Sequence, residues 1–385
     1  MRVSVRETSE DTRAAFSRAS PGAGEHAFAF AKASGIIGKS FVGKRISALG
    51  RVASLADLDR LVFPDAGREA LSSASQNLPG RELLVDLERR ILRRTTRHMI
   101  AVMHSYERPP ELLVRMLRSC EYTDLKACLR HIIVGKEEPP AFIDIGRFRT
   151  VQFESYPDLA LMLKGSEFEF VLKKDLDSLR SPDFDINSLE AELDRHYYAL
   201  LIKSLHQLGP EDRHFVETIL AQEISLRNCV WALRLRVYFK KKPGETAEYL
   251  MGITSPQDKS GTDSQYGVEE ISGKRASFAA DARESLHFSL NYRPDWKKWR
   301  WESLLNPELA TENWEANPRY FQNAASRYIY RLAQRYFHRE PFSVGSIFCF
   351  FKIKQFEEDI LTSLAEGLAL GMGGGEVFDV LEMPR

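Results

Sequence analysis

Three similar segments recur along the sequence, and this self-similarity constrains the fold more than any other feature. VDLERRILRRTTRHMIAVMHSYERPP, from residue 85, resembles INSLEAELDRHYYALLIKSLHQLGP, from residue 186, and NPRYFQNAASRYIYRLAQRYFHREP, from residue 317. Each segment ends in proline, and proline suits the first turn of a helix. A second apolar stretch follows each time: ELLVRMLRSCEYTDLKACLR, EDRHFVETILAQEISLRNCVWALRLR and FSVGSIFCFFKIKQFEEDILTSLAEG. Such long repeats predict a repeated architecture.

The spacing of apolar residues is helical from about residue 27 to 235. In residues 83–104, for example, Leu84, Leu87 and Ile91 recur at steps of three or four, as on one face of a helix. Alternation typical of strands occurs only in FIDIGRFRTVQF, residues 142–153, which we interpret as a connector or one short hairpin. We therefore expect an all-α fold.

The expected organisation has five parts. We predict a polar N-terminal extension over residues 1–26, a first helical repeat over 27–140 and a second over 141–240. A polar insertion or linker follows over 241–280, and the third repeat over 281–385 carries a flexible Gly-rich tail, GMGGGE, at 371–376. The N-terminus lacks the apolar core of a signal peptide, and no stretch has about 18 uninterrupted apolar residues. We expect neither export by this route nor a membrane span.

Charge and cysteine content indicate a cytoplasmic protein whose net charge produces no strong electrostatic field. Lysine plus arginine and aspartate plus glutamate each number 54, so any charged partner must meet a local patch. The four cysteines have no CxxC spacing, which favours reduced, mostly buried thiols over disulfides or a zinc site.

No catalytic or cofactor motif is complete. GIIGKS, at 35–40, has Ala33 where a phosphate loop needs glycine, and GMGGGE lacks the spacing of a dinucleotide fingerprint. The nine histidines form no HExxH or HxH pair, and no GxSxG turn marks a serine. We expect no metal, no cofactor and no enzymatic activity.

We interpret the charged clusters of the sequence as surface or interface features. Lys352 and Lys354 stand near Glu357 and Glu358 at helical spacing, which predicts a solvated, salt-bridged face. KKK at 240–242, beside Tyr238 and Phe239, and WKKWRW at 296–301 could contact nucleic-acid phosphates. The balanced charge instead favours a snorkelling helix end or a protein interface.

Aligning the copies reveals a set of signature residues. At an offset of 104 residues Asp124 superposes on Asn228, and Arg130 on Arg234. The pattern resembles the C subunits of bacterial and archaeal V/A-type ATPases, whose eukaryotic V-ATPase equivalents are called d subunits, over residues 27–375. The matching residues are Tyr122, Leu125, Lys126 and Arg130 in the first copy, Glu223, Ile224, Asn228 and Arg234 in the second, and Phe350, Lys354, Glu357, Ala365, Glu366 and Gly367 in the third.

The chain also departs from this family pattern. Asp124 replaces an asparagine in the first copy and Ser225 an aspartate in the second, while Ile360 and Thr362 replace an asparagine and an arginine in the third. The polar N-terminus and the insertion lie outside the usual pattern. The chain therefore looks like a divergent member.

The resemblance implies a funnel of three similar helical domains around a pseudo-threefold axis, with the first and last helices of the chain packed together. Such a protein sits on the cytoplasmic face of the membrane proteolipid ring, receives the tip of the central stalk, formed by the D and F subunits, in its cavity, and lies near the membrane stator (a/I). It transmits rotation for ion transport or ATP synthesis and catalyses no reaction. The resemblance assigns no residue to a partner contact.

Two other hypotheses stay open on the residues alone. An unrelated helical adaptor would show stacked units in an open arc. An all-α enzyme with a dispersed site would need a deep pocket lined by carboxylates or histidines of perturbed pKa. In each case we expect Asn228 and Arg234 to hydrogen-bond across neighbouring helices or to cap a loop of the second repeat, because buried amide and guanidinium groups need partners.

Overall fold

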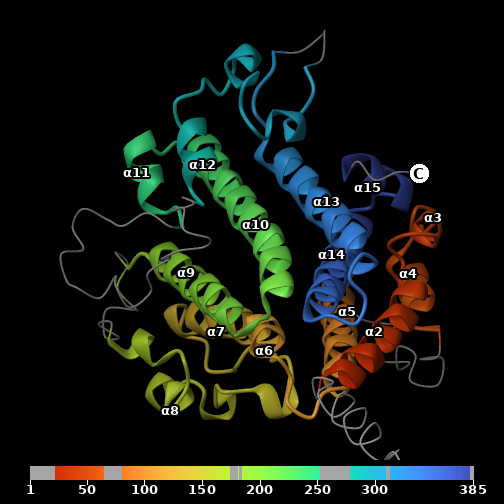
Figure 1. The fold of residues 1–385 in the computed structure, drawn as a ribbon. Coiled ribbons are helices and arrows are strands. Elements are labelled where there is room, and N and C mark those ends of the chain that lie inside the picture. Colours follow the sequence, from red (N-terminus) through yellow and green to blue (C-terminus); the bar gives the residue numbers. More distant parts are fainter. Residues whose placement is uncertain are drawn as a thin grey trace, which may run out of the picture.

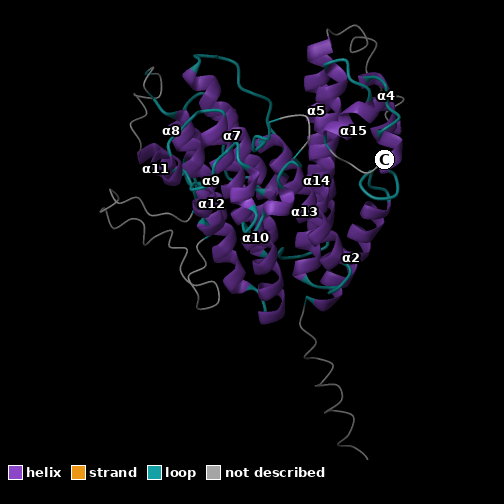
Figure 2. Cartoon of the chain, turned by 90° about the horizontal axis from the view of Figure 1, so that it is seen from above, coloured by secondary structure: helices purple, strands orange, loops and turns teal. Residues whose placement is uncertain are grey.

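The computed structural model describes residues 22–64, 80–173, 181, 184–251, 278–308 and 313–381. Within these ranges every regular element is a helix (Figure 2), so the all-α prediction is confirmed. Residues 142–153 hold only the short 3-10 turn η3 (Gly146–Phe148) and the first residue of η4 (Phe153–Ser155), so the connector is confirmed and the hairpin is wrong. Residues 1–21 of the predicted extension and 252–277 of the insertion lie outside the described residues.

Six helices form the framework, and they come in three consecutive pairs. α5 (Gly80–Met103) leads through α6 (Glu111–Leu117) to α7 (Ser119–Ile133), α9 (Ile186–Ser204) leads to α10 (Pro210–Val237), and α13 (Pro318–Phe337) leads to α14 (Val344–Ala369). Prolines mark the junction within each pair: Pro110 precedes the connecting helix α6, Pro210 is the first residue of α10, and Pro341 comes shortly before the Ser343 cap of α14.

The second helix of each pair packs on the first helix of another pair. α7 contacts α9, α10 contacts α13, and α14 contacts α5 as well as its own partner α13. α14 also packs on α2 (Ala23–Gly38), as Figure 1 shows. The last long helix therefore lies against the first helices of the described chain, and the succession of helices closes on itself.

Shorter helices cover the framework. They are α3 (Ile46–Leu49), α4 (Leu55–Val62), α8 (Leu159–Leu163), α11 (Pro243–Glu248), α12 (Ala280–Ser285) and α15 (Gly374–Val380), with the 3-10 turns η5 (Glu169–Lys173), η7 (Leu205–Gln207), η9 (Arg293–Trp296) and η10 (Glu302–Leu304). No helix among the described residues has the length and apolar character needed to cross a bilayer. All four cysteines are free; three are buried and Cys120 is half-buried.

The prediction of a flexible Gly-rich tail is wrong for residues 371–376. Gly371 turns the chain with a φ of +86°, and Gly374 begins α15, which packs on α14. The Gly374 N–H donates to the Val52 carbonyl at 2.9 Å. Glycine is needed at position 374 because a bulkier residue would not fit this close approach of two backbones.

The aromatic residues of WKKWRW lie in the core. Trp296, Trp299 and Trp301 are buried, and each indole N–H donates inside the protein, to the Ser289 carbonyl at 2.8 Å, the Asp281 carbonyl at 2.9 Å and Asp281 Oδ2 at 3.0 Å. These rings cannot stack on bases. Tyr238 and Phe239, at the end of α10, are exposed, as a protein interface would require.

Candidate functional site

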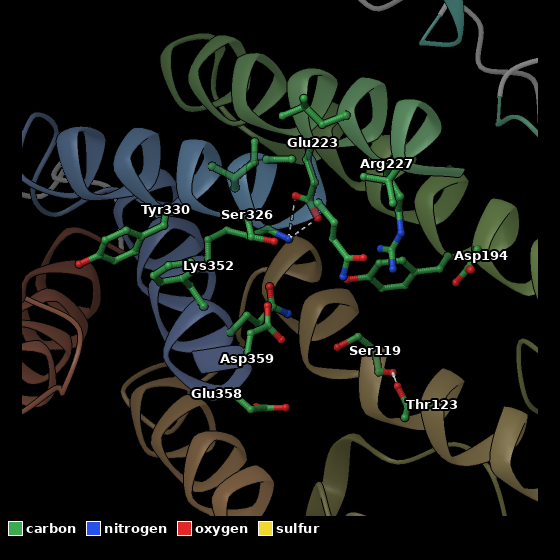
Figure 3. A pocket seen from close by; sticks show the side chains of 18 of the residues that line it. Ser119, Thr123, Asp194, Glu223, Arg227, Ser326, Tyr330, Lys352, Glu358 and Asp359 are labelled. Atoms are coloured by element: carbon green, nitrogen blue, oxygen red, sulfur yellow. Dashed lines mark hydrogen bonds and ion pairs between the residues drawn. The ribbon is translucent and has the colours of Figure 1, made fainter. Parts of the chain in front are cut away.

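The three helix pairs meet around a central cavity of about 550 Å³. All six framework helices contribute to its wall, together with Ile143 (Figure 3). A second cavity of about 270 Å³ lies between α13 and α14 and shares Gln322, Ser326, Phe356, Glu358 and Asp359 with the first. The described chain thus encloses a lumen to which every helix pair contributes.

The lumen wall carries charged residues from three of the framework helices. Its ionisable residues are Asp194 on α9, Glu223, Arg227 and Arg234 on α10, and Lys352, Glu358 and Asp359 on α14. On α10 and α14 these residues recur at helical steps, such as 223, 227 and 234. This stripe of charges was visible in the sequence as the polar residues of EISLRNCVWALRLR, but only Glu223 and Arg234 belonged to the predicted signature.

An ion pair at the wall connects α14 with α10. Lys352 Nζ lies 2.8 Å from Glu223 Oε2 and 2.9 Å from Oε1. Glu223 also accepts the Tyr198 hydroxyl at 3.1 Å, and Arg227 donates to that hydroxyl at 2.6 Å. Helices α9, α10 and α14 are therefore joined by one polar network (Figure 3).

The signature residues of the first copy face α9. Lys126 Nζ pairs with Asp194 at 2.7 Å, and Arg130 binds both oxygens of Glu190 at 2.6 and 2.7 Å. The Tyr122 hydroxyl lies 2.7 Å from His196 Nδ1. Burial lowers the pKa of His196 to about 4, so this imidazole is neutral near pH 7. Leu125 is buried in the core.

Asn228 and Asp124, which superpose in the alignment, both bind a segment that follows their own helix. Asn228 Nδ2 donates to the carbonyls of Met251 and Phe278, and its Oδ1 accepts the Met251 N–H. Asp124 Oδ2 accepts the Ile143 N–H at 2.8 Å. Asn228 binds loop segments, as expected, but Met251 and Phe278 belong to the predicted insertion and not to the second repeat. Arg234 donates to Gln322 on α13, across a neighbouring helix as expected.

Another set of superposed positions has the same role. Glu121, three residues before Asp124, accepts the N–H groups of Thr150 at 2.6 Å and Val151 at 2.8 Å. Ser225, three residues before Asn228, donates to Asp281 at 2.6 Å. In both copies a polar side chain of the second helix binds a segment that follows it, a loop in the first copy and the start of α12 in the second.

In the third copy Glu357, three residues before Ile360, holds residues near the start of the chain. Its carboxylate accepts the Phe41 N–H at 2.7 Å and the Ser40 hydroxyl at 3.0 Å, and it pairs with Lys354. Ser40 ends the GIIGKS sequence, whose other residues belong to the end of α2 or its C-cap. This segment is therefore a helix end tied to α14, with no preceding strand among the described residues.

The predicted solvated face of α14 is wrong. Lys354 and Glu357 are fully buried, Lys352 is 6% exposed, and Phe350 is buried beside them. The sequence could not reveal this because α14 packs on α13, α5, α2 and α15, so charges at helical spacing pair inside the protein. Glu358 is half-buried and Asp359 is exposed, and both line the lumen.

The lumen is better suited to binding a partner than to catalysing a reaction. Its lining residues include no histidine, and burial raises the pKa of the Cys120 thiol to about 12, so that this thiol is not ionised near neutral pH. Within the ranges that the structure describes, no group of three or more histidine, cysteine or acidic side chains is placed to hold a metal ion. The wall is suited to a polar partner.

Comparison with known proteins finds similarity to a protein family and to a relative of similar length. A family model described as ATP synthase (C/AC39) subunit matches residues 69–375. The chain is also 28% identical to an uncharacterized protein of Treponema pallidum (strain Nichols) over 354 residues, which cover 89% of this chain and 92% of that protein.

Proposed function

Because the chain belongs to the ATP synthase (C/AC39) subunit family, we propose that it is the central-stalk coupling subunit of a rotary V/A-type ATPase. In this role it links the shaft formed by the D and F subunits to the membrane proteolipid ring and transmits torque for ion transport or ATP synthesis. It performs no chemical step. It works at the cytoplasmic surface of the membrane, next to the stator (a/I), and is held there by the complex.

The central cavity carries this proposal. Every helix pair supplies part of its wall, so an object seated in the lumen would press on all three pairs at once. A torque applied there is spread around the protein and does not load one helix. Three similar domains around a pseudo-threefold axis would produce such a lumen, and the contacts that Glu121, Ser225 and Glu357 make from equivalent positions support that arrangement.

A coupling part must also be stiff, because a compliant part would store torque as strain. α14 is buried on nearly all sides, and close packing of protein interiors leaves little room for deformation. Ion pairs between helices of different pairs, such as Lys352 with Glu223 and Lys126 with Asp194, add polar connections. The closed succession of helices favours this function over an open-arc adaptor.

An enzymatic alternative has one observation in its favour. Burial, reinforced by the charge of Asp359, raises the pKa of Glu358 to about 8, as in carboxyl groups that act as general acids. The lining residues provide no histidine or activated thiol to work with it. Family membership therefore supports the coupling role over an enzymatic one.

Co-purification and site-specific crosslinking test the proposal together. A photo-crosslinking amino acid at Ser326, in the lumen, should capture one of the two shaft proteins in isolated complexes, whereas the same group at Lys164, exposed outside the lumen, should not. The tagged chain should also co-purify with the proteolipid ring. A stable monomer that recovers neither shaft nor ring would refute the function, and capture of the shaft only from position 164 would refute its seat in the cavity.

A further inference from the structure

The charges that line the cavity point to the chemistry of whatever enters it. The proposed function places the tip of the shaft in the lumen, and we propose that Glu358 and Asp359 there bind a lysine or arginine side chain carried by that tip. The inference rests on the proposed function, in which the partner is the tip of the shaft.

The size of the cavity limits how much of a partner can enter. A helix with its side chains is about 10–12 Å wide and rises 5.4 Å per turn, so one turn fills ~400–600 Å³. The lumen holds about 550 Å³. Only the tip of a helical hairpin or shaft would be enclosed, and the identity of a few tip residues would decide recognition.

Most charged groups of the lumen already have partners. Asp194 pairs with Lys126, Glu223 pairs with Lys352, and Arg234 donates to Gln322. Arg227 donates to the Tyr198 hydroxyl. These four groups therefore need no new hydrogen-bond or ion-pair partner when a helix enters the lumen.

Glu358 and Asp359 differ from the rest of the wall. Among the described residues, no lysine or arginine forms an ion pair with either carboxylate. Glu358 has a hydrogen bond with Thr95 and is attracted by Lys354, and Asp359 is attracted by Arg227 and Lys352. All three cations are bonded to other residues. The lumen thus has two neighbouring carboxyl groups on α14 that lack an ion pair of their own.

Glu358 and Asp359 lie where a side chain of a bound partner can reach them. Both line the central cavity and the smaller one, so they stand where the two spaces meet. In Figure 3 both side chains extend from α14 toward the centre of the lumen. Two adjacent carboxyl groups repel each other when both are ionised, and a cation placed between them would favour the ionised form of both. A long lysine or arginine side chain can reach such a position.

The experiment measures binding of the purified D–F shaft, from the same organism, to four forms of the full chain at several salt concentrations. The forms are wild type, the double variant Glu358→Gln with Asp359→Asn, Asp359→Lys, and Glu284→Gln as a control for loss of an exposed carboxylate. The double variant should bind at least about tenfold more weakly, with a smaller salt dependence. Asp359→Lys should bind more weakly still, and Glu284→Gln should match wild type.

Two further readouts separate recognition from folding. The melting temperature of the double variant should equal or exceed that of wild type, because the substitutions remove two crowded carboxylates. A lysine-to-glutamate or arginine-to-glutamate change at one position of the shaft tip should restore binding to Asp359→Lys. If wild type binds the shaft and the double variant binds equally well with the same salt dependence, the inference is wrong while the proposed function stands. If wild type does not bind, the proposed function itself fails.

Discussion

The side-chain amide of Asn228 and the peptide groups of Met251 bind each other in both directions. Nδ2 donates to the Met251 carbonyl at 3.1 Å, and the Met251 N–H donates to Oδ1 at 2.9 Å. Nδ2 also donates to the Phe278 carbonyl at 2.9 Å. This one buried amide therefore connects the middle of α10 with two chain segments that are distant in sequence, which explains a polar residue in an apolar helix.

Asn228→Leu should destabilise the protein by roughly 2–4 kcal/mol, because three buried backbone groups lose their partners at once. Thermal or urea unfolding would measure the loss. Asn187→Leu is a matched control, since Asn187 is exposed near the start of α9, and it should change stability by less than about 0.5 kcal/mol. An unchanged midpoint for Asn228→Leu would show that the amide contributes nothing to folding.

The sequence predicted those features that depend on local pattern. Helical spacing and the three prolines predicted the six framework helices, and the superposition of Asp124 on Asn228 identified two residues with the same structural role. The sequence could not show which charged residues face water. Lys354 and Glu357 had the spacing of a surface pair, yet they are buried because α14 is covered by helices distant in the chain. The lumen residues Glu358 and Asp359 were missed for the same reason.

Asp124 should make stability depend on pH. Burial raises the pKa of this carboxyl to about 7 from an ordinary value of 3.8, although its hydrogen bond from the Ile143 N–H opposes the shift. The folded state therefore keeps a proton that the unfolded state releases, and the stability due to this group is lost as pH rises from about 4 to about 7.

Asp124→Asn keeps the shape and a possible acceptor without the charge. The variant should be more stable than wild type by about 1–2 kcal/mol at pH 8, and the difference should vanish near pH 4. Melting curves across this range test the sign. Glu137→Gln, at an exposed site, controls for loss of a surface charge. A variant that is less stable at pH 8 than at pH 4, relative to wild type, would contradict the assignment.

Substitution by alanine should lower the stability of the protein at one of two neighbouring glycines in α15 but not at the other. A Cβ on Gly374 would lie 2.6 Å from the Leu49 carbonyl oxygen and 2.8 Å from that of Val52, whereas a Cβ on Gly375 would meet nothing closer than 3.7 Å. Gly374→Ala should cost about 1–3 kcal/mol, because two backbones must separate. Gly375→Ala should be neutral or stabilising by up to about 1 kcal/mol, since alanine favours helix.

Hydrogen exchange of residues 374–380 gives a local test of the same pair. Protection of α15 should fall in Gly374→Ala and persist in Gly375→Ala. Equal protection in both variants would mean that the contact with residues 49–52 does not hold the helix in place.

The ion pair between Lys352 and Glu223 should be strongly coupled, because it has little access to water. The two side chains are 6% and 18% exposed, so screening is weak. Glu223→Gln leaves a buried ammonium without its carboxylate and should cost about 3 kcal/mol or more. Lys352→Met should cost less, because Glu223 retains the Tyr198 hydroxyl as a donor and reaches the water of the lumen.

A double-mutant cycle isolates the pair from these separate effects. If the two groups stabilise each other, the double variant should lose about 1–3 kcal/mol less than the sum of the single changes in urea unfolding. Additive losses would mean that the helices α10 and α14 are held together by apolar packing alone. In that event the ion pair could not contribute to the stiffness that a coupling part needs, and torque transmission would depend on the close packing of α14.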